Sequence, residues 1–217
     1  KRVMNTMKST MNINEMRHYQ LDILGISEMR WTDSGKIESD GMTIYYSGGT
    51  KHEKGVGIIL TKEMAKSVIA WEPASERIIM VRIETRYTKV TLIQVYAPTN
   101  AAEDQEKDEF YELLQDVLDA TPEHDMKIIM GDFNAQIGRD NTGWEETLGK
   151  EAIGVRNENG ERLLSYCSSN KLKIGGSMFR HKNIHLGTWR SPNGSTVNQI
   201  DHICYQRRWA ASVQDVR

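Results

Sequence analysis

Short apolar runs alternate with polar turns along most of the chain, and this pattern predicts many β-strands. The runs are rich in Val, Ile and Leu and are bounded by Gly, Pro, Asn or Asp, which is typical of strands. We expect strands at residues 21–27, 42–46, 56–60, 78–84, 89–96, 126–134, 172–174 and 197–205. The segments 33–40 and 136–155 are polar and contain several glycines, so we expect surface loops there.

Two longer stretches show helical periodicity instead. In residues 102–120, apolar side chains recur three and four positions apart, and acidic residues cover the opposite face. A second helix is expected after Gly160 and ends near Asn170, and Asn14 can cap a short helix that runs to about Tyr19. The pattern therefore predicts many strands and two amphipathic helices that can cover them.

The composition is that of an ordinary globular domain. Charged residues make up 27% and aromatic residues 7% of the 217 positions. This length suits one domain over 1–217, with two small domains as the alternative. The formal net charge of −2 argues against a purely electrostatic nucleic-acid binder, but it leaves room for an enzyme with a local basic patch. Cys167 and Cys204 form neither a metal-ligand spacing nor a disulfide framework, which favours a reducing compartment. No apolar stretch is long enough to span a membrane, and the start lacks a signal-peptide core.

The most informative stretch is the strand that ends in Gly131-Asp132-Phe133-Asn134. Alternation along an extended chain puts Asp132 and Asn134 on one face and Phe133 on the other. A carboxylate and an amide at one strand end can hold a phosphate and a hard cation such as Mg²⁺. An Asp/Asn turn without chemistry is the alternative, and for this short motif alone it is the more common case.

Other predicted strands also end in polar side chains. Glu28 follows the strand at 21–27, and Tyr96 ends the strand at 89–96. Glu28 and Asp132 would suit a shared metal if their strands belong to one sheet. The simpler interpretations are a solvated loop carboxylate for Glu28 and a half-buried aromatic ring with a wet hydroxyl for Tyr96.

Basic residues gather at two places that suit a DNA backbone. Arg30 lies two residues after Glu28, and the segment with Arg180, His181 and Lys182 is the most basic part of the chain. Arginine and lysine side chains contact phosphates without reading sequence. A solvated loop is the alternative for the second segment.

A carboxylate also interrupts the strand at 197–205, where Asp201 stands between apolar residues. Such a group is costly to bury unless it is paired or bonded to a donor. The neighbouring His202 suggests a catalytic Asp-His dyad. However, adjacent residues of a regular strand point to opposite faces, so Asp201 and His202 cannot both serve one site.

Taken together, five motifs resemble one family, in its order and at similar spacings. They are Ser27-Glu28-Met29-Arg30-Trp31, Gln94-Val95-Tyr96-Ala97-Pro98-Thr99, Gly131-Asp132-Phe133-Asn134, Thr188-Trp189 and Gln199-Ile200-Asp201-His202-Ile203. The family is the endonuclease/exonuclease/phosphatase superfamily. Within it the chain most resembles the apurinic-like endonuclease domains of non-LTR (LINE-type) retrotransposons and the craniofacial development protein 2-like sequences. The resemblance runs from about Leu21 to the end.

The resemblance implies a four-layer α/β sandwich, in which two mixed sheets pack face to face with helices outside. It also implies hydrolysis of phosphodiester bonds in DNA with Mg²⁺, or Mn²⁺ as a second option, and therefore an intracellular, nuclear protein. By position, Glu28 corresponds to the metal ligand, Asp132 to the residue that positions or deprotonates water, and Asn134 to a phosphate contact. Tyr96 corresponds to a contact with the phosphate or the nucleophile, and Thr188 to a polar contact on the phosphate side.

Asp201 corresponds to the aspartate that orients the family's catalytic histidine. That histidine belongs to a Ser-Asp-His motif near the end of the family's domain, and these 217 residues contain no such motif. The family's first strand ends in an asparagine at the metal site, and Asn5 is the nearest candidate here, in surroundings that do not match. We therefore expect a domain that lacks its first and last strands and hydrolyses DNA poorly.

Two alternatives to a retrotransposon-type nicking enzyme stay open from the sequence. One keeps the fold and changes the substrate, to abasic-site repair or to hydrolysis of other phosphoesters, because the fold does not choose among substrates. The other is a non-catalytic remnant that binds nucleic acid. The sequence predicts neither the oligomeric state nor a target-site preference.

Overall fold

The computed structural model describes residues 13–191 and 193–216. Contacts within the chain group into two compact units: unit 1 comprises Lys1–Tyr96 and Thr121–Asp125, and unit 2 comprises Ala97–Ala120 and Met126–Arg217. The expectation of one domain over 1–217 stays a prediction, and Asn5 lies outside the described residues. In the described part, no helix is both long and apolar enough to cross a membrane.

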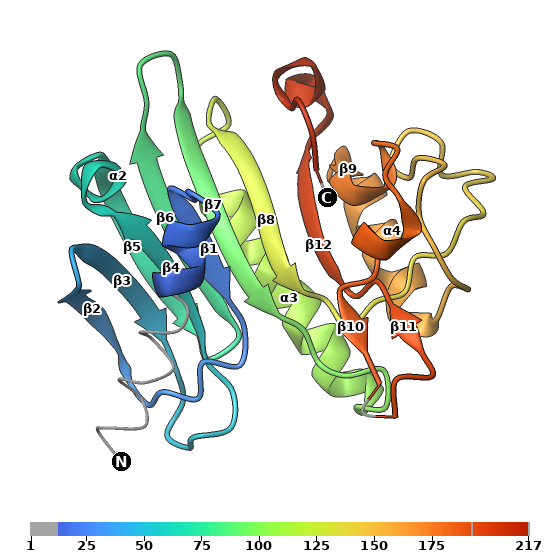
Figure 1. Cartoon of the computed structure of the whole chain (residues 1–217), viewed down its shortest axis with the longest axis horizontal. Helices are drawn as coiled ribbons and strands as arrows, with labels where there is room; N and C mark the ends of the chain where they lie inside the picture. Colours follow the sequence, from blue (N-terminus) through green and yellow to red (C-terminus); the bar gives the residue numbers. More distant parts are fainter. Residues whose placement is uncertain (1–12, 192, 217) are drawn as a thin grey trace. The chain divides into compact units, whose positions relative to one another are not determined.

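Unit 1 is built from antiparallel strands. Its four-stranded sheet has the order β1-β4-β3-β2, and β5, β6 and β7 follow one another in a second group with β6 in the middle (Figure 1). The bounds are β1 Ile23–Ile26, β2 Ser34–Ser39, β3 Met42–Ser47, β4 Val56–Thr61, β5 Val68–Ser75, β6 Ile78–Glu84 and β7 Lys89–Tyr96, with the short helix α2 at Lys62–Lys66 between β4 and β5.

The core of unit 1 lies between these two groups of strands, because β3 and β4 pack against β5, β6 and β7. Tyr45 of β3 meets Trp71 of β5 with ring centroids 5.4 Å apart, and Ile58, the strand partner of Tyr45, is fully buried. The opposite face of the four-stranded sheet is covered too, since Ile44 and Ile59 pack there with Ile13, Met16 and Met29. Strands covered in this way need few polar positions, which explains the nearly continuous apolar runs in β4 and β7.

Unit 2 combines three antiparallel strands in the order β8-β12-β9 with two helices. Its elements are α3 Asp104–Ala120, β8 Met126–Asp132, α4 Glu158–Ser169, β9 Leu172–Ile174, the hairpin β10 Trp189–Arg190 and β11 Val197–Asn198, and β12 Asp201–Gln206, with 3-10 turns η1 Gly175–Ser177, η2 Asn183–His185 and η3 Arg207–Ser212.

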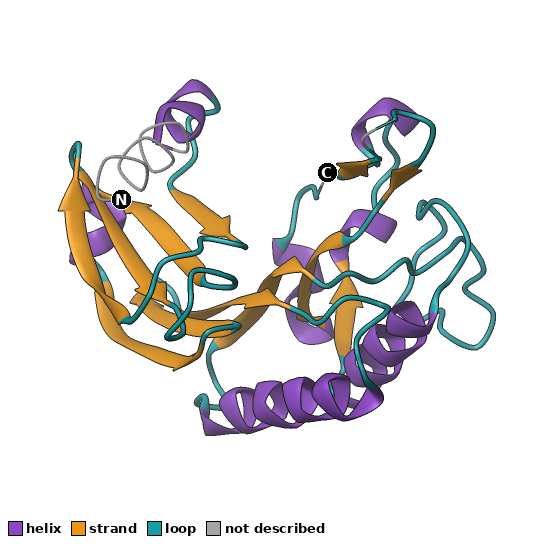
Figure 2. Cartoon of the chain, turned by 90° about the horizontal axis from the view of Figure 1, so that it is seen from below, coloured by secondary structure: helices purple, strands orange, loops and turns teal. Residues whose placement is uncertain are grey.

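The two helices of unit 2 lie against each other (Figure 2). The Tyr166 hydroxyl donates to the Leu114 carbonyl at 3.3 Å, and the buried Lys107 ammonium lies 3.2 Å from a Glu158 carboxylate oxygen. The Asn157 side chain caps α4 by accepting from the Gly160 N–H.

The predicted α/β class is confirmed, with two multi-stranded sheets and helices. Three local expectations were wrong. Residues 33–40 contain β2 rather than a loop, because Asp40-Gly41 makes a tight turn with positive φ at both positions and pairs β2 with β3. The strand at 197–205 is two strands, since β11 pairs with β10 while β12 pairs with β8 and β9. Residue 13 is already helical, so Asn14 is not a cap. In addition, β5 was not foreseen.

Candidate active site

In unit 1, Glu28 stands on a sharp turn just after β1. Glu28 and Arg30 both have left-handed backbone angles, with φ of 52° and 57°. Such angles cost free energy in residues other than glycine, so neighbouring contacts must hold them. The Met29 and Arg30 N–H groups donate to the carbonyls of Gly55 and Lys54 at 2.8 and 2.7 Å. The loop before β4 therefore sets the direction of the Glu28 side chain.

Two donors fix the Glu28 carboxylate. The Tyr96 hydroxyl donates to one oxygen at 2.6 Å, and the Arg30 guanidinium donates to the other at 3.2 Å. Behind Tyr96, the Arg77 guanidinium lies 5.2 Å from the ring centroid and donates to the Tyr96 carbonyl at 3.0 Å. The Glu28 side chain remains 47% exposed, so a ligand from solvent can still reach it.

In unit 2, strand register brings two carboxylates together. Asp201 on β12 is the direct partner of Asp132 at the end of β8. Directly opposed residues of an antiparallel pair point to the same face, with their Cβ atoms about 5 Å apart. Asp201 is an exposed residue, yet the protein packed around its carboxylate raises its pKa, and a hydrogen bond from Thr188 opposes that shift.

Asn134 joins Asp132 through a turn and not through strand alternation. The strand β8 ends at Asp132, and Asn134 has a left-handed φ of 49°. The Asn134 N–H donates to Asp132 Oδ1 at 2.8 Å, and its Nδ2 donates to the Ala97 carbonyl at 2.9 Å. Phe133 between them is buried, as expected. The predicted proximity therefore arises from a closed Asx turn.

Thr188 forms hydrogen bonds with the start of β12. Its hydroxyl oxygen accepts from the N–H groups of Ile200 and Asp201 at 3.1 and 3.2 Å and bonds to the Asp201 carboxylate. A hydroxyl has one donor and two acceptor sites, so these three bonds use all of them. This geometry holds Asp201 in place, and the phosphate contact that the resemblance implies for Thr188 stays a prediction.

His202 is not part of a dyad with Asp201. It points to the opposite, buried face of β12, and its Nε2 lies 2.8 Å from the Ala135 carbonyl oxygen. Burial lowers the pKa of His202 to about 4, so the ring is neutral near pH 7 and Nε2 is the donor. The alternation argument is confirmed here.

The basic residues divide between the units. Arg180, His181 and Lys182 share one loop of unit 2 and line a hollow, whereas Arg30 lies in unit 1 beside Glu28. A single strip containing all four stays a prediction.

The donors of these groups suit a hard divalent cation. Glu28 offers an exposed carboxylate whose two oxygens each accept one hydrogen bond, and a carboxylate oxygen has a second lone pair for a metal. Mg²⁺ is commonly held by one or two carboxylates, with water and substrate phosphate completing the shell. Among residues 13–191 and 193–216, no three His, Cys, Asp or Glu side chains cluster as a metal-binding group.

The structure thus brings Glu28, Tyr96 and Arg30 together in unit 1, and it brings Asp132, Asn134, Thr188 and Asp201 together in unit 2. Sequence reasoning missed Arg77, which contacts Tyr96. Arg77 stands one residue before the strand expected at 78–84, and nothing in the local sequence pattern indicates a contact with Tyr96.

The comparisons with known proteins agree with this architecture. The family model described as "Endonuclease/Exonuclease/phosphatase family" matches residues 11–217. Craniofacial development protein 2 of Bos taurus is 39% identical over 217 residues, which is all of this chain and 36% of that protein. The chain therefore spans little more than a third of this relative.

Two solved structures share the fold. The 3′ phosphatase NExo from Neisseria, bound to a product DNA hairpin, has a TM-score of 0.69 at 20% identity, over 97% of this chain and 86% of that one. The endonuclease domain of TRAS1, a telomere-specific non-LTR retrotransposon, has a TM-score of 0.64 at 16% identity, over 94% and 82%. At these identities the likeness shows the fold alone, whereas the family match covers nearly the whole chain. The chain belongs to the endonuclease/exonuclease/phosphatase family.

Proposed function

We propose that this chain is a Mg²⁺-dependent endonuclease domain that nicks DNA, of the type found in non-LTR retrotransposons. The observation that supports it most is the register pair of Asp132 and Asp201, with Asn134 tied to the same strand end. Paired carboxylates beside an amide suit a reaction in which water attacks a phosphate. Family membership supports hydrolysis, and the TRAS1 and NExo folds support DNA as the substrate.

In unit 2, each polar group has its own proposed task. Asp132 accepts the proton of the attacking water, as a general base. Asn134 has two N–H groups on Nδ2: one donates to Ala97, and we assign the other to the phosphate. Asp201, held by Thr188, keeps a second carboxylate directly opposite Asp132 on the paired strand.

In unit 1, Glu28 would hold Mg²⁺, and Tyr96 and Arg30 would keep its carboxylate oriented. When bound, the cation stabilises negative charge on the phosphate and the leaving oxygen. Because the Tyr96 hydroxyl donates to Glu28, it can contact phosphate only when that bond opens. A DNA substrate would place the reaction in the nucleus of a cell that has one.

The test is Mg²⁺-dependent nicking of supercoiled plasmid by the purified 217-residue polypeptide. We expect slow nicking, because the polypeptide contains no Ser-Asp-His motif and losing one preorganised group commonly costs about a hundredfold to a thousandfold in rate. The activity should need Mg²⁺ and vanish in Asp132→Ala, which also excludes a contaminating nuclease. Equal nicking by wild type and Asp132→Ala would refute the proposal.

Three further substrates distinguish the proposed nicking activity from abasic-site repair and from hydrolysis of other phosphoesters. We compare the cleavage rates of three substrates at the same enzyme concentration: a duplex with one abasic site, a plain duplex and a small aromatic phosphoester. The proposal predicts that the plain duplex is cut about as fast as the abasic one. A strong preference for the abasic duplex would indicate repair, and hydrolysis of the small ester alone would indicate a phosphoesterase.

A further inference from the structure

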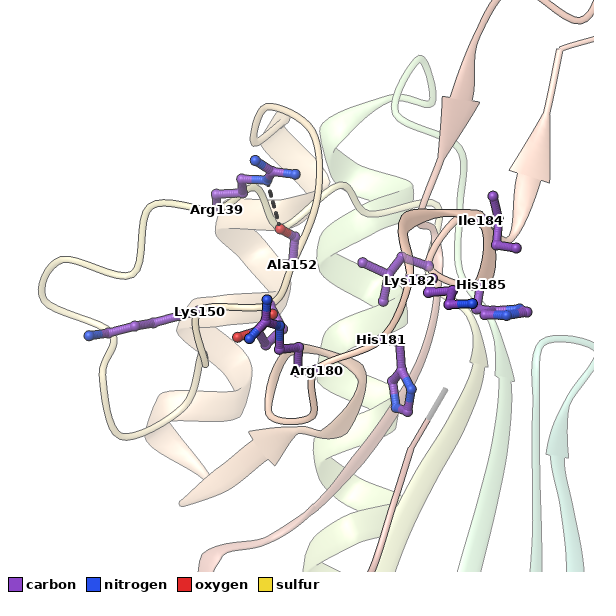
Figure 3. Close-up of a pocket in the computed structure, with 10 residues that line it drawn as sticks. Arg139, Lys150, Ala152, Arg180, His181, Lys182, Ile184 and His185 are labelled. Carbon is purple, nitrogen blue, oxygen red and sulfur yellow. Dashed lines mark hydrogen bonds between the residues drawn. The ribbon is translucent and has the colours of Figure 1, made fainter.

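A wide basic hollow lies in unit 2, apart from the carboxylate pair. Its volume is about 920 Å³. Two loops form it: one supplies Arg139 and Lys150, and the other supplies the segment from Arg180 to Leu186 (Figure 3). The full lining is Arg139, Lys150, Glu151, Ala152, Arg180, His181, Lys182, Ile184, His185 and Leu186.

The charge of the lining is strongly one-sided. Four side chains carry a permanent positive charge, and Glu151 is the one carboxylate among the residues that line the hollow. A smaller hollow of about 460 Å³ in unit 1 offers a comparison, because its three lysines are mixed with the carboxylates of Glu38 and Asp40. Clefts lined by one sign of charge attract ligands of the opposite sign. The hollow in unit 2 therefore suits a polyanion, whereas the one in unit 1 does not.

Both loops of the hollow are held in place. The Arg139 guanidinium donates to the Ala152 carbonyl at 3.2 Å, and the Glu151 N–H donates to the Ser177 carbonyl at 3.0 Å. Gly149 packs so closely that a Cβ there would collide with the Ser177 carbonyl oxygen. The first loop is thus docked on η1. A preformed site loses less conformational entropy on binding a ligand than a flexible site does.

The second loop is anchored as well. His181 Nε2 lies 2.8 Å from the Asp215 carboxylate, and Leu186 at the end of the segment is buried. Arg180 and Lys182 on either side of His181 are exposed. Their charges are therefore available to a ligand that enters the hollow.

The hollow lies close to the carboxylate pair along the chain. His185 is three residues before Thr188, which clasps Asp201. Three residues span at most about 11 Å, so the edge of the hollow is within a few nucleotides of that pair.

We propose that this hollow binds the sugar-phosphate backbone of duplex DNA a few nucleotides from the bond that is cut. The inference rests on the proposed function and adds where the flanking DNA is held. Lysine and arginine neutralise phosphates and contribute binding that does not depend on sequence. The described lining contains no Phe, Tyr or Trp, so it offers no stacking platform for unpaired bases. Duplex DNA is therefore the occupant, in preference to a single strand.

The experiment measures binding separately from cleavage. Fluorescence anisotropy with a labelled duplex, in EDTA, gives Kd over a series of salt concentrations. The variant Lys150→Gln/Lys182→Gln removes two charges of the hollow. It should weaken binding about tenfold or more near 0.1 M salt and reduce the slope of log K against log salt by about 1.8. The matched control Lys36→Gln/Lys62→Gln removes the same charge from the hollow in unit 1 and should leave both values unchanged.

A gain-of-affinity variant excludes simple misfolding as the cause. Glu151→Gln removes the one carboxylate of the lining, and it should tighten duplex binding two- to threefold, on the order of a weak surface charge interaction. A single strand of the same length should respond less to the two variants of the hollow. If the hollow variant binds duplex as tightly as the control does, or if Glu151→Gln weakens binding, the inference is wrong.

The two proposals fail in different ways. If wild type nicks plasmid but the hollow variant binds duplex normally, the hollow inference fails and the proposed function stands. If binding depends on the hollow but no sample nicks DNA with Mg²⁺, the hollow inference stands and the proposed function fails.

Discussion

The two units hold their acidic groups by different means. In unit 2, Asp132 and Asp201 face each other because the strands that carry them are paired in register. In unit 1, Glu28 stands on a left-handed turn, and its carboxylate is fixed by Tyr96 and Arg30. The first arrangement follows from strand pairing. The second is a turn held by backbone hydrogen bonds to Lys54 and Gly55, and two side chains fix its carboxylate.

This difference suggests a division of work. A carboxylate fixed by a sheet stays in one place, which suits a group that must accept a proton from a precisely positioned water. A half-exposed carboxylate on a turn can exchange water and ligands, which suits a metal that must meet its substrate. We therefore expect changes in unit 2 to act on the rate and changes at Glu28 to act on the need for Mg²⁺.

The largest effect is expected from Asp132→Asn. The amide keeps an oxygen that can accept from the Asn134 N–H, so the turn should survive while the base is lost. General-base catalysis commonly contributes about 10² to 10⁴ in rate. Single-turnover nicking with excess enzyme should fall by that factor, at an unchanged melting temperature. A fall of less than threefold would remove Asp132 from the base role.

We expect the folded protein to lose stability at acid pH because His202 is buried on the inner face of β12. The pKa of His202 is about 4 in the folded protein and 6.5 in the unfolded chain, so below pH 6.5 the unfolded chain binds a proton that the folded protein does not. Stability from His202 is therefore fully present above pH 6.5 and falls between pH 6.5 and about 4, by roughly 3 kcal/mol in all.

Urea unfolding at several pH values checks this. His202→Gln should flatten the pH dependence in that window, and the exposed control His124→Gln should not. An unchanged slope in His202→Gln would mean that other groups carry the acid sensitivity.

Particular residues show how far sequence reasoning reached. Alternation placed Asp201 and His202 on opposite faces, and the apolar runs located β6, β7 and β9 to the residue, because both depend only on local pattern. Alternation failed at Asn134, where an Asx turn replaces the strand. The alternation pattern also could not predict the turn at Glu28, because that turn depends on the carbonyl groups of Lys54 and Gly55, which are distant in the sequence.

A smaller effect is expected from Tyr96→Phe. The change removes one hydrogen bond to the Glu28 carboxylate and leaves the ring against Arg77. A hydrogen bond to a charged group is worth about 1.5 kcal/mol when well shielded, so activity at limiting Mg²⁺ should fall by up to about tenfold. At saturating Mg²⁺ the loss should shrink. An equal loss at all Mg²⁺ concentrations would assign Tyr96 to the phosphate instead.

The smallest effect is expected from Arg30→Gln. Both partners of this ion pair are about half exposed, at 54% and 47% of their side-chain surface. Exposed pairs contribute about 0 to 1 kcal/mol, so the free energy of unfolding should change by less than about 0.5 kcal/mol. Chemical denaturation measures this directly, and a loss several times larger would show that Arg30 holds the turn itself.

The division of work is tested most directly by the nicking rate as a function of Mg²⁺ concentration. Wild type, Glu28→Gln and Asp132→Asn are compared under single-turnover conditions. We predict that Glu28→Gln moves the half-activating Mg²⁺ concentration upward by about tenfold or more, whereas Asp132→Asn lowers the plateau and leaves the midpoint in place. If Glu28→Gln keeps the wild-type midpoint, or if both variants shift it equally, Glu28 is not the distinct metal carboxylate of this domain.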